Sequence, residues 1–318
     1  MASIDGVAQR PALTPRRVLL YGLGALWLLD GLLQLQPGMF TMDMISTIMS
    51  PAATGEPGWL NAIINWSIHV VTPHLVAFNW TVSILQLLIG VLLLMPRKPL
   101  VTTGLWLSIV WGVLVWVFGE GIGQLLTGTA TFLTGAPGSV FLYVVASILL
   151  LLPEERLSWW RNRRVDAATW TVAFTLVVGA ALQLSPVFWT SLGIASPFGS
   201  AAMMPQPLWI RGTIDAAATL VAKAPIAANL AIIVVTLGVG LLLLSMPYRR
   251  WVFWVAMVWL AIVWWFGQDL GMLYGGMATD PNSAPILAVM LWAGWTARPA
   301  GVAAAARDDV PPEASPAD

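Results

Sequence analysis

The residues best placed to do chemistry are acids and amides within a glycine-rich stretch that occurs twice. Residues 115–137 contain Glu120, and residues 263–285, which begin 148 positions later, contain Gln268 and Asp269. Eleven of the 23 aligned positions are identical without a gap, far above chance for this composition. A carboxyl can carry a proton or bind a cation, whereas an amide can only form hydrogen bonds. The two copies therefore predict one scaffold with two non-equivalent polar sites.

A second candidate is Asp30, which lies in an apolar run 13 residues beyond Arg17. At ~1.5 Å per helical residue it stands ~20 Å into a hydrocarbon core ~30 Å thick. An ionisable group there costs at least ~2.5 kcal/mol and is a functional candidate by default. We expect Asp30 to exchange a proton near neutrality and Glu120, nearer water, to stay charged. The alternative role for Asp30 is a structural carboxyl, because its counterpart in the second copy is Gly179.

The outward loops contain two cations, Arg211 and Lys223. Arg211 either contacts an acid of the other half or pairs with Asp215, four residues along the same helix. The residues that we predict to bind a substrate are Asp30, Gln34, Glu120, Arg211, Asp215, Gln268 and Asp269. No catalytic residue is identified.

Metal and thiol chemistry find little support. The chain has no cysteine, which excludes thiolate nucleophiles and disulfide exchange. Thioethers favour Cu(I), but methionine is also a common gap-filler in apolar packing. The candidate ligands are Met39, Met42, Met44, Met49, His69 and His74. Because the two histidines are five residues apart, they do not share a helix face, and no metal site is predicted. A net charge of zero gives no indication of a nucleic-acid partner.

Composition indicates a membrane protein that crosses the bilayer several times. Hydrophobic residues make up 58% of the chain and charged residues 9%, and the mean hydropathy is +0.80. A soluble domain has roughly 25% charged residues. Eight runs approach the ~20 apolar residues that a span requires. The first run follows arginines but has no small-residue cleavage site, so we interpret it as a retained helix.

The predicted fold is all-α, with eight transmembrane helices in two four-helix bundles. The predicted segments are a leader at 1–16, a first four-span repeat at 17–152, a linker at 153–166, a second repeat at 167–300 and a disordered tail at 301–318. The first repeat has spans at about 17–36, 75–95, 100–119 and 139–152, with short interfacial helices at 38–50 and 59–69. Spans four and eight are short, and the stretches before them are either re-entrant and cavity-lining or ordinary outer loops.

The duplication extends over whole halves. Matched pairs are Leu33–Pro37 with Leu182–Pro186, Asn79 with Asn229, Gly90 with Gly240, and Trp106, Trp111 and Trp116 with Trp254, Trp259 and Trp264. The tryptophans are five residues apart, so they wind around the helix instead of forming one face. Since each half has an even number of spans, both enter from the same side, as in a parallel repeat.

Lysine and arginine fix the expected orientation. They concentrate at the leader, the even-to-odd turns, the linker and the tail, and positive residues favour the cytoplasmic side. We therefore expect a plasma-membrane protein with both termini cytoplasmic and the glycine-rich stretches facing outward. The lipid bilayer is its first partner, and a second copy or another membrane protein is a further candidate.

The ends of the first two spans in each half resemble the DoxX-like family of four-span membrane proteins. The residues that carry the resemblance are Gly31–Pro37 with its copy, and Gln86–Leu94. The family's lysine is replaced by Gln34 and Gln183, and its glutamate by Asn79, Gln86 or Asn229. The resemblance implies a membrane subunit near the quinone pool, with quinone as a cofactor. The full pattern is also similar to polytopic membrane proteins of actinobacteria.

The sequence favours an outward-facing binding or transport-type site between the two repeats, without identifying the substrate. Asp30 and Glu120 would supply the acids, Arg211 the cation, and Gln268 with Asp269 a degenerate partner site. The alternatives are a quinone-linked redox subunit and an assembly partner without a small ligand. The residues themselves require no cofactor.

Overall fold

The computed structural model describes residues 14–153, 165–202 and 205–296, which form helices and loops without a strand. The first half contains α1 (Pro15–Leu33), α2 (Ser50–Ala53), α3 (Gly58–Val71), α4 (Leu75–Leu94), α5 (Lys98–Phe118) and α6 (Ser139–Leu151). The second half contains α8 (Ala167–Leu182), α9 (Ser191–Ala202), α10 (Leu208–Lys223), α11 (Pro225–Ser245), α12 (Arg250–Phe266) and α13 (Ser283–Thr296). The expected disordered tail, most of the leader and most of the linker lie outside the described residues.

Local sequence explains where the first helix of each half begins. The Thr14 side chain accepts a hydrogen bond from the backbone N–H of Arg17, and Pro15 occupies the first turn, where its missing N–H costs nothing. The helix therefore starts two residues before the predicted boundary. Asp166 caps α8 in the same way by accepting from the backbone N–H of Thr169, 2.9 Å away.

The apolar runs form helices of unequal length. Three helical segments of the described chain are long and apolar enough to cross a bilayer, at 58–94, 98–118 and 225–245. Five shorter apolar helices include α6 with 13 residues and α13 with 14. At ~1.5 Å per residue each of these two covers only ~20 Å, less than a ~30 Å core. A membrane span that contains α6 or α13 would therefore also need part of the chain that precedes the helix.

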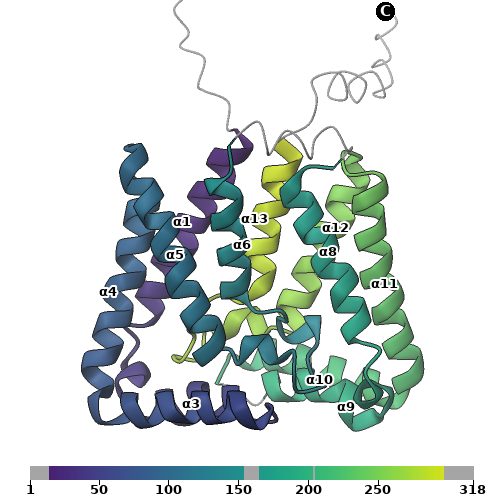
Figure 1. The fold of residues 1–318 in the computed structure, drawn as a ribbon. Coiled ribbons are helices and arrows are strands. Elements are labelled where there is room, and N and C mark those ends of the chain that lie inside the picture. The colour runs from purple at the N-terminus through teal and green to yellow at the C-terminus, as the bar shows by residue number, and fades with distance from the viewer. Residues whose placement is uncertain (1–13, 154–164, 203–204, 297–318) are drawn as a thin grey trace, which may run out of the picture.

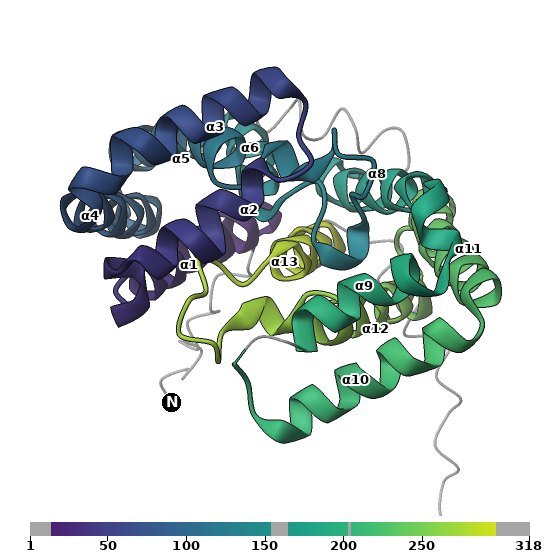
Figure 2. The same ribbon diagram turned by 90° about the horizontal axis from the view of Figure 1, so that it is seen from below.

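The predicted interfacial segments are also helical. The region predicted as one helix at 38–50 is broken into a 3-10 turn at Pro37–Phe40, a π-helix at Met44–Met49 and α2. Figure 1 shows α3 and α10 lying across one end of the bundle, roughly perpendicular to the other helices. Seen from that end, α13 lies near the centre (Figure 2), where it packs against α1, α6, α8 and α12.

Each half is built around one close helix pair, α1 with α4 and α8 with α11. Glycine makes the approach between α1 and α4 close: a Cβ added at Gly31 would lie 2.8 Å from the backbone nitrogen of Leu87. Asn79 donates to the carbonyl of Gln34 at 2.8 Å, and Asn229 donates to the carbonyl of Gln183 at 3.2 Å. The matched asparagines thus tie the two pairs together in the same way.

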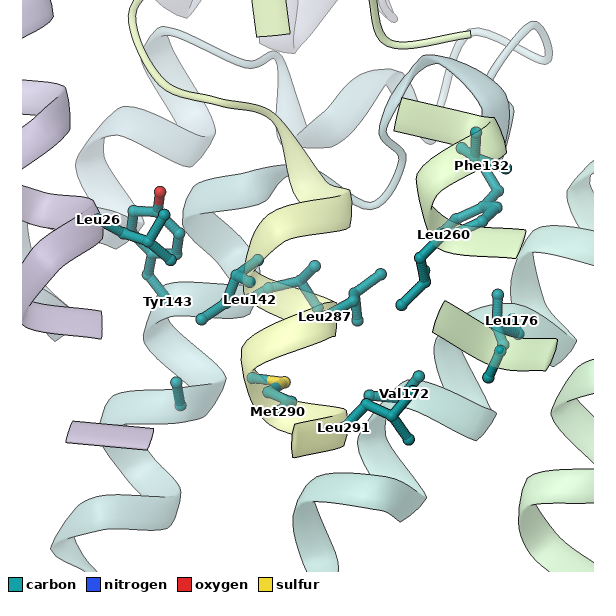
Figure 3. Packing of buried hydrophobic residues seen from close by; sticks show 14 of the residues in the cluster. Leu26, Phe132, Leu142, Tyr143, Val172, Leu176, Leu260, Leu287, Met290 and Leu291 are labelled. Atoms are coloured by element: carbon teal, nitrogen blue, oxygen red, sulfur yellow. The ribbon is translucent and has the colours of Figure 1, made fainter. Parts of the chain in front are cut away.

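The largest apolar cluster runs through both halves (Figure 3). Tyr143 and Leu26 lie at one end of the view, and Phe132 and Leu176 lie at the other. All four side chains are almost fully buried. Phe132 belongs to the 3-10 turn Phe132–Thr134 within the first glycine-rich stretch, so this stretch contributes to the core.

The tryptophans of α5 and α12 occupy different environments, as their spacing predicts. Trp106 and Trp254 are exposed on α5 and α12. Trp116 donates its indole N–H to the carbonyl of Pro137 at 2.8 Å, and Trp264 donates to that of Pro281 at the same distance. The last turns of α5 and α12 are therefore fastened to the chain that leads into α6 and α13.

Candidate functional site

The two glycine-rich stretches share an unusual backbone. Residues 121–124 and 269–272 are two runs of four consecutive positive φ angles. Five of these eight residues are not glycine, and each left-handed non-glycine residue costs of order 1–3 kcal/mol. Such strain persists only where surrounding structure fixes it. Ala130, Thr131 and Ala278 in these stretches are buried, whereas Thr129 and Tyr274 are exposed, so each stretch packs partly inside the protein.

The contacts of the tryptophans correct the register of the repeat. The gapless alignment matches Pro137 with Pro285, yet Trp264 bonds to Pro281 where Trp116 bonds to Pro137. The first stretch is therefore four residues longer than the second before the next helix begins. The additional chain forms the turn Phe132–Thr134, which has no counterpart in the second stretch.

Glu120 follows α5 and Gln268 follows α12, and their side chains bind the first residues of α6 and α13 in equivalent ways. One oxygen of Glu120 accepts from the Ser139 hydroxyl at 2.8 Å and from the Val140 backbone N–H at 3.3 Å. Gln268 accepts from the Ala284 backbone N–H at 3.1 Å and donates to the Ser283 hydroxyl at 2.9 Å. The amide and the carboxyl thus perform the same capping task.

The carboxyl differs from the amide in its second oxygen. Oε2 of Glu120 is buried and has no hydrogen-bond partner. Burial, and next the charge of Asp280, raise the pKa of Glu120 to about 8. At neutral pH Glu120 is therefore mostly protonated, and our expectation that it stays charged is wrong. Burial also raises the pKa of Asp269 to about 6.

A cavity of about 310 Å³ lies in the first half between α1, α3, α4 and α5. Asp30, Gln34 and Gln86 line it and are almost fully buried. The Tyr143 hydroxyl donates to Asp30 at a long 3.5 Å, and the side-chain oxygens of Gln34 and Gln86 have no partner. Buried polar atoms are normally satisfied, so these orphaned oxygens point to a ligand in the cavity.

A smaller pocket of about 210 Å³ lies between the two glycine-rich stretches. Its lining has a larger polar share than that of the cavity, with Gly135 from the first stretch and Asn282 from the second. Glu120, Thr279 and Asp280 line both spaces. The apolar cavity and the polar pocket therefore meet at two carboxyl groups.

Sequence reasoning missed Asp280. Its two carboxylate oxygens accept from the Asn282 backbone N–H at 2.7 Å and from the Thr279 hydroxyl at 2.9 Å. Its charge acts on both Asp30 and Glu120. The signal available was an acid in an outward stretch with almost no cations. The gapless alignment hid it by matching Asp280 with the apolar Phe132.

Next to Gly179 in the second half, the first stretch fills the space that corresponds to the apolar cavity. A Cβ added at Gly179, the counterpart of Asp30, would lie 2.7 Å from Cβ of Phe132. The Thr131 hydroxyl donates to the side-chain oxygen of Gln183 at 2.6 Å. In the first half, the matching Thr279 bonds to Asp280 instead and leaves Gln34 unpartnered. The second half is thus plugged beside Gly179, whereas the first half is open beside Asp30.

Arg211 and Asp215 are not brought to the carboxyl groups. They pair with each other along α10, with Nε 3.6 Å from the carboxylate oxygen, and both side chains are about half exposed. This is the local arrangement that their four-residue spacing allows. Gln268 and Asp269 directly follow α12 in the second half and line neither space.

The methionines and histidines of the first half lie apart. Met39, Met44 and Met49 pack in a small apolar cluster, whereas His69 and His74 are exposed. Within the described ranges no three His, Cys, Asp or Glu side chains are close enough to hold a metal ion.

Comparisons with protein families, with curated proteins and with solved structures gave no match. The assignment of a function therefore depends on the geometry of the site.

Proposed function

We propose that this is a multi-pass plasma-membrane protein whose outward-facing site binds or transports a small ligand. The observation that carries the proposal is the cavity with the buried Asp30 and the orphaned amides of Gln34 and Gln86. Glu120 and Asp280 stand between this cavity and the polar pocket. In this proposal the site belongs to both halves, because Asp280 comes from the second and the other groups from the first.

The proposal includes eight spans in two parallel four-span repeats. Three helical segments reach spanning length, and the shorter apolar helices run beside them in the same bundle (Figure 1). The short α6 and α13 are extended by the packed glycine-rich stretches, and irregular backbone at membrane depth is tolerated when it is buried in protein. The turn at Arg97 and Lys98 lies at the end opposite α3 and α10, which supports an outward position for the site.

A quinone-linked redox role is the second candidate. It is favoured by the indole N–H of Trp111, which lines the cavity without a hydrogen-bond partner and could bind a quinone carbonyl. Quinone that copurifies with the protein and is lost on Trp111→Phe would support this role over transport.

Two serines of the first half provide a matched test of the site. Ser67 lines the cavity, whereas Ser83 is buried on α4 away from it, and both hydroxyls bond to a carbonyl of their own helix. The chain has no native cysteine. We expect Ser67→Cys to react with 2-aminoethyl methanethiosulfonate added outside intact cells, and Ser83→Cys to stay unreactive.

Labelling is read by mass spectrometry of the purified variants. Equal reaction of the two variants would show that the cavity is not a selective route for small molecules. Reaction of Ser67→Cys only after the membrane is broken would place the cavity on the wrong side. Either outcome contradicts the proposed function.

A further inference from the structure

Resting on the proposed function, we propose that the ligand is a lipophilic organic cation, an ammonium group on an apolar body. The ammonium group binds among Asp30, Glu120 and Asp280, and the body fills the apolar part of the cavity. Three independent features of the lining support this ligand class.

The first feature is unbalanced charge. The carboxyls of Asp30, Glu120 and Asp280 are close enough to repel one another. No lysine, arginine or histidine lines the cavity or the adjoining pocket, and the single described ion pair of the chain is on α10. A buried carboxylate is costly unless it is paired, so Asp30 and Glu120 either hold protons or receive a cation from the ligand. An ammonium ligand replaces those protons.

The second feature is an excess of hydrogen-bond acceptors. The side-chain oxygens of Gln34 and Gln86 have no partner, and both residues are only 4% exposed. Oε2 of Glu120 is free as well and accepts once the carboxyl has given up its proton. Against these acceptors stands one unpartnered donor in the lining, the indole N–H of Trp111, so a ligand that fits the cavity donates hydrogen bonds or carries positive charge. An anionic ligand, including a phospholipid head group with its phosphate, would face repulsion without a compensating cation.

The third feature is the apolar and aromatic remainder of the lining. Phe78, Trp111 and Phe118 line the cavity, and aromatic faces attract organic cations. Trp66 and Leu114 also line it, and they are 62% and 42% exposed, so they stand where the cavity meets the surface. An apolar mouth on the flank of a membrane protein admits a ligand from the bilayer, which a lipophilic cation can reach.

The test compares two molecules of the same shape that differ in charge. Phenyltrimethylammonium and its neutral isostere tert-butylbenzene are titrated calorimetrically into the full chain in lipid nanodiscs, with empty nanodiscs correcting for partition. We expect the cation to bind at least about tenfold more tightly than the isostere. Asp30→Asn should abolish that preference, whereas Asp215→Asn, which removes an exposed acid of the α10 ion pair, should leave it unchanged.

Glu120→Gln provides a second variant in case Asp30→Asn does not fold, since Gln268 shows that an amide fits the equivalent position. It should also weaken the preference for the cation. Binding of the neutral isostere as tightly as the cation would overturn the ligand class and leave the proposed site intact. Absence of binding by either molecule, together with an unreactive Ser67→Cys variant, would overturn the proposed function itself.

Discussion

Glu120 shows how one carboxyl differs from an amide at the same place in a fold. Gln268 satisfies its surroundings with both ends of its side chain. Glu120 satisfies the same kind of helix start with one oxygen and leaves the other unpartnered beside Asp280. The first half therefore keeps a group that can lose a proton where the scaffold needs only a hydrogen-bonding cap.

This difference predicts a pH-dependent stability. Because the pKa of Glu120 in the folded chain is about 8 and its ordinary value is 4.5, ionisation destabilises the fold. The contribution is fully present below about pH 4.5 and is lost as the pH rises through about 8, by at most ~1.4 kcal/mol per pH unit. Glu120→Gln should therefore raise the Tm in detergent relative to the native chain at about pH 9 and leave it nearly unchanged at about pH 4.

The reciprocal variant is the control. Gln268→Glu places a carboxyl against the carbonyl of Phe132, to which the amide now donates at 3.4 Å, and should make stability fall more steeply with pH. Parallel Tm profiles of the native chain and Glu120→Gln would show that Glu120 is not the titrating group.

At this scale the sequence singled out Asp30, Gln34 and Glu120, which line one cavity in the structure, but it placed Glu120 nearer water than it lies. Asp30 was a candidate because an acid deep in an apolar run is energetically costly. Gln34 and Glu120 were candidates because the other half has a matched polar residue at each position. Asp280 escaped because a four-residue difference between the copies shifted the alignment. The local pairing of Arg211 with Asp215 could not be decided from spacing alone.

Among the elements, the turn Phe132–Thr134 has the greatest structural effect for its length. In the second half, the ring of Phe132 packs against Gly179. The preceding Thr131 donates its hydroxyl to the side-chain oxygen of Gln183. The neighbouring Leu133 lies against Gly267, where an added Cβ would approach its carbonyl oxygen at 2.3 Å. Helix α12 is thereby packed against the same turn.

Truncation of this ring should destabilise the protein. Phe132→Ala removes a side chain that is 2% exposed, and loss of a buried phenylalanine typically costs about 3–5 kcal/mol. The measurement is the free energy of unfolding in mixed micelles. Phe174→Ala is the matched control, because Phe174 is exposed on α8 and should change stability little. Similar losses in both variants would mean that the ring does not act as a plug.

The sequence predicted the regular elements more closely than the irregular ones. Helices α4, α5 and α6 begin and end within two residues of the predicted spans, because turns with proline or glycine separate long apolar runs. The runs of positive φ angles were not predictable, since they place Ile122 and Leu270 in a conformation that their own side chains disfavour. Packing around the stretches overrides that preference.

For the molecule as a whole, the orientation in the bilayer is open to direct measurement. Thr129 and Tyr274 are exposed positions in the first and second glycine-rich stretches. In a chain without native cysteine, Thr129→Cys and Tyr274→Cys should each react with a membrane-impermeant maleimide added outside cells. The reason is the concentration of Lys and Arg at the opposite end.

A cysteine introduced at Pro96, in the turn between α4 and α5, serves as the inward control and should react only after the cells are broken. Outside labelling of Pro96→Cys together with protection of the other two positions would invert the topology. Composition and the spacing of apolar runs were sufficient to predict a helical chain with segments long and apolar enough to cross a bilayer. They did not predict that each glycine-rich stretch would reach into the opposite half, because this contact depends on packing between distant segments.

The plug has a consequence for symmetry. Phe132 lies on the first stretch and fills the space beside Gly179 in the second half. In a dimer of two identical four-span chains, any turn that closed one chamber would close both, and any acid that opened one would open both. Two units that can differ in sequence escape this constraint, and joining them in a single chain lets one copy fill its chamber to brace the other. Covalent fusion therefore permits the spaces beside Asp30 and Gly179 to differ.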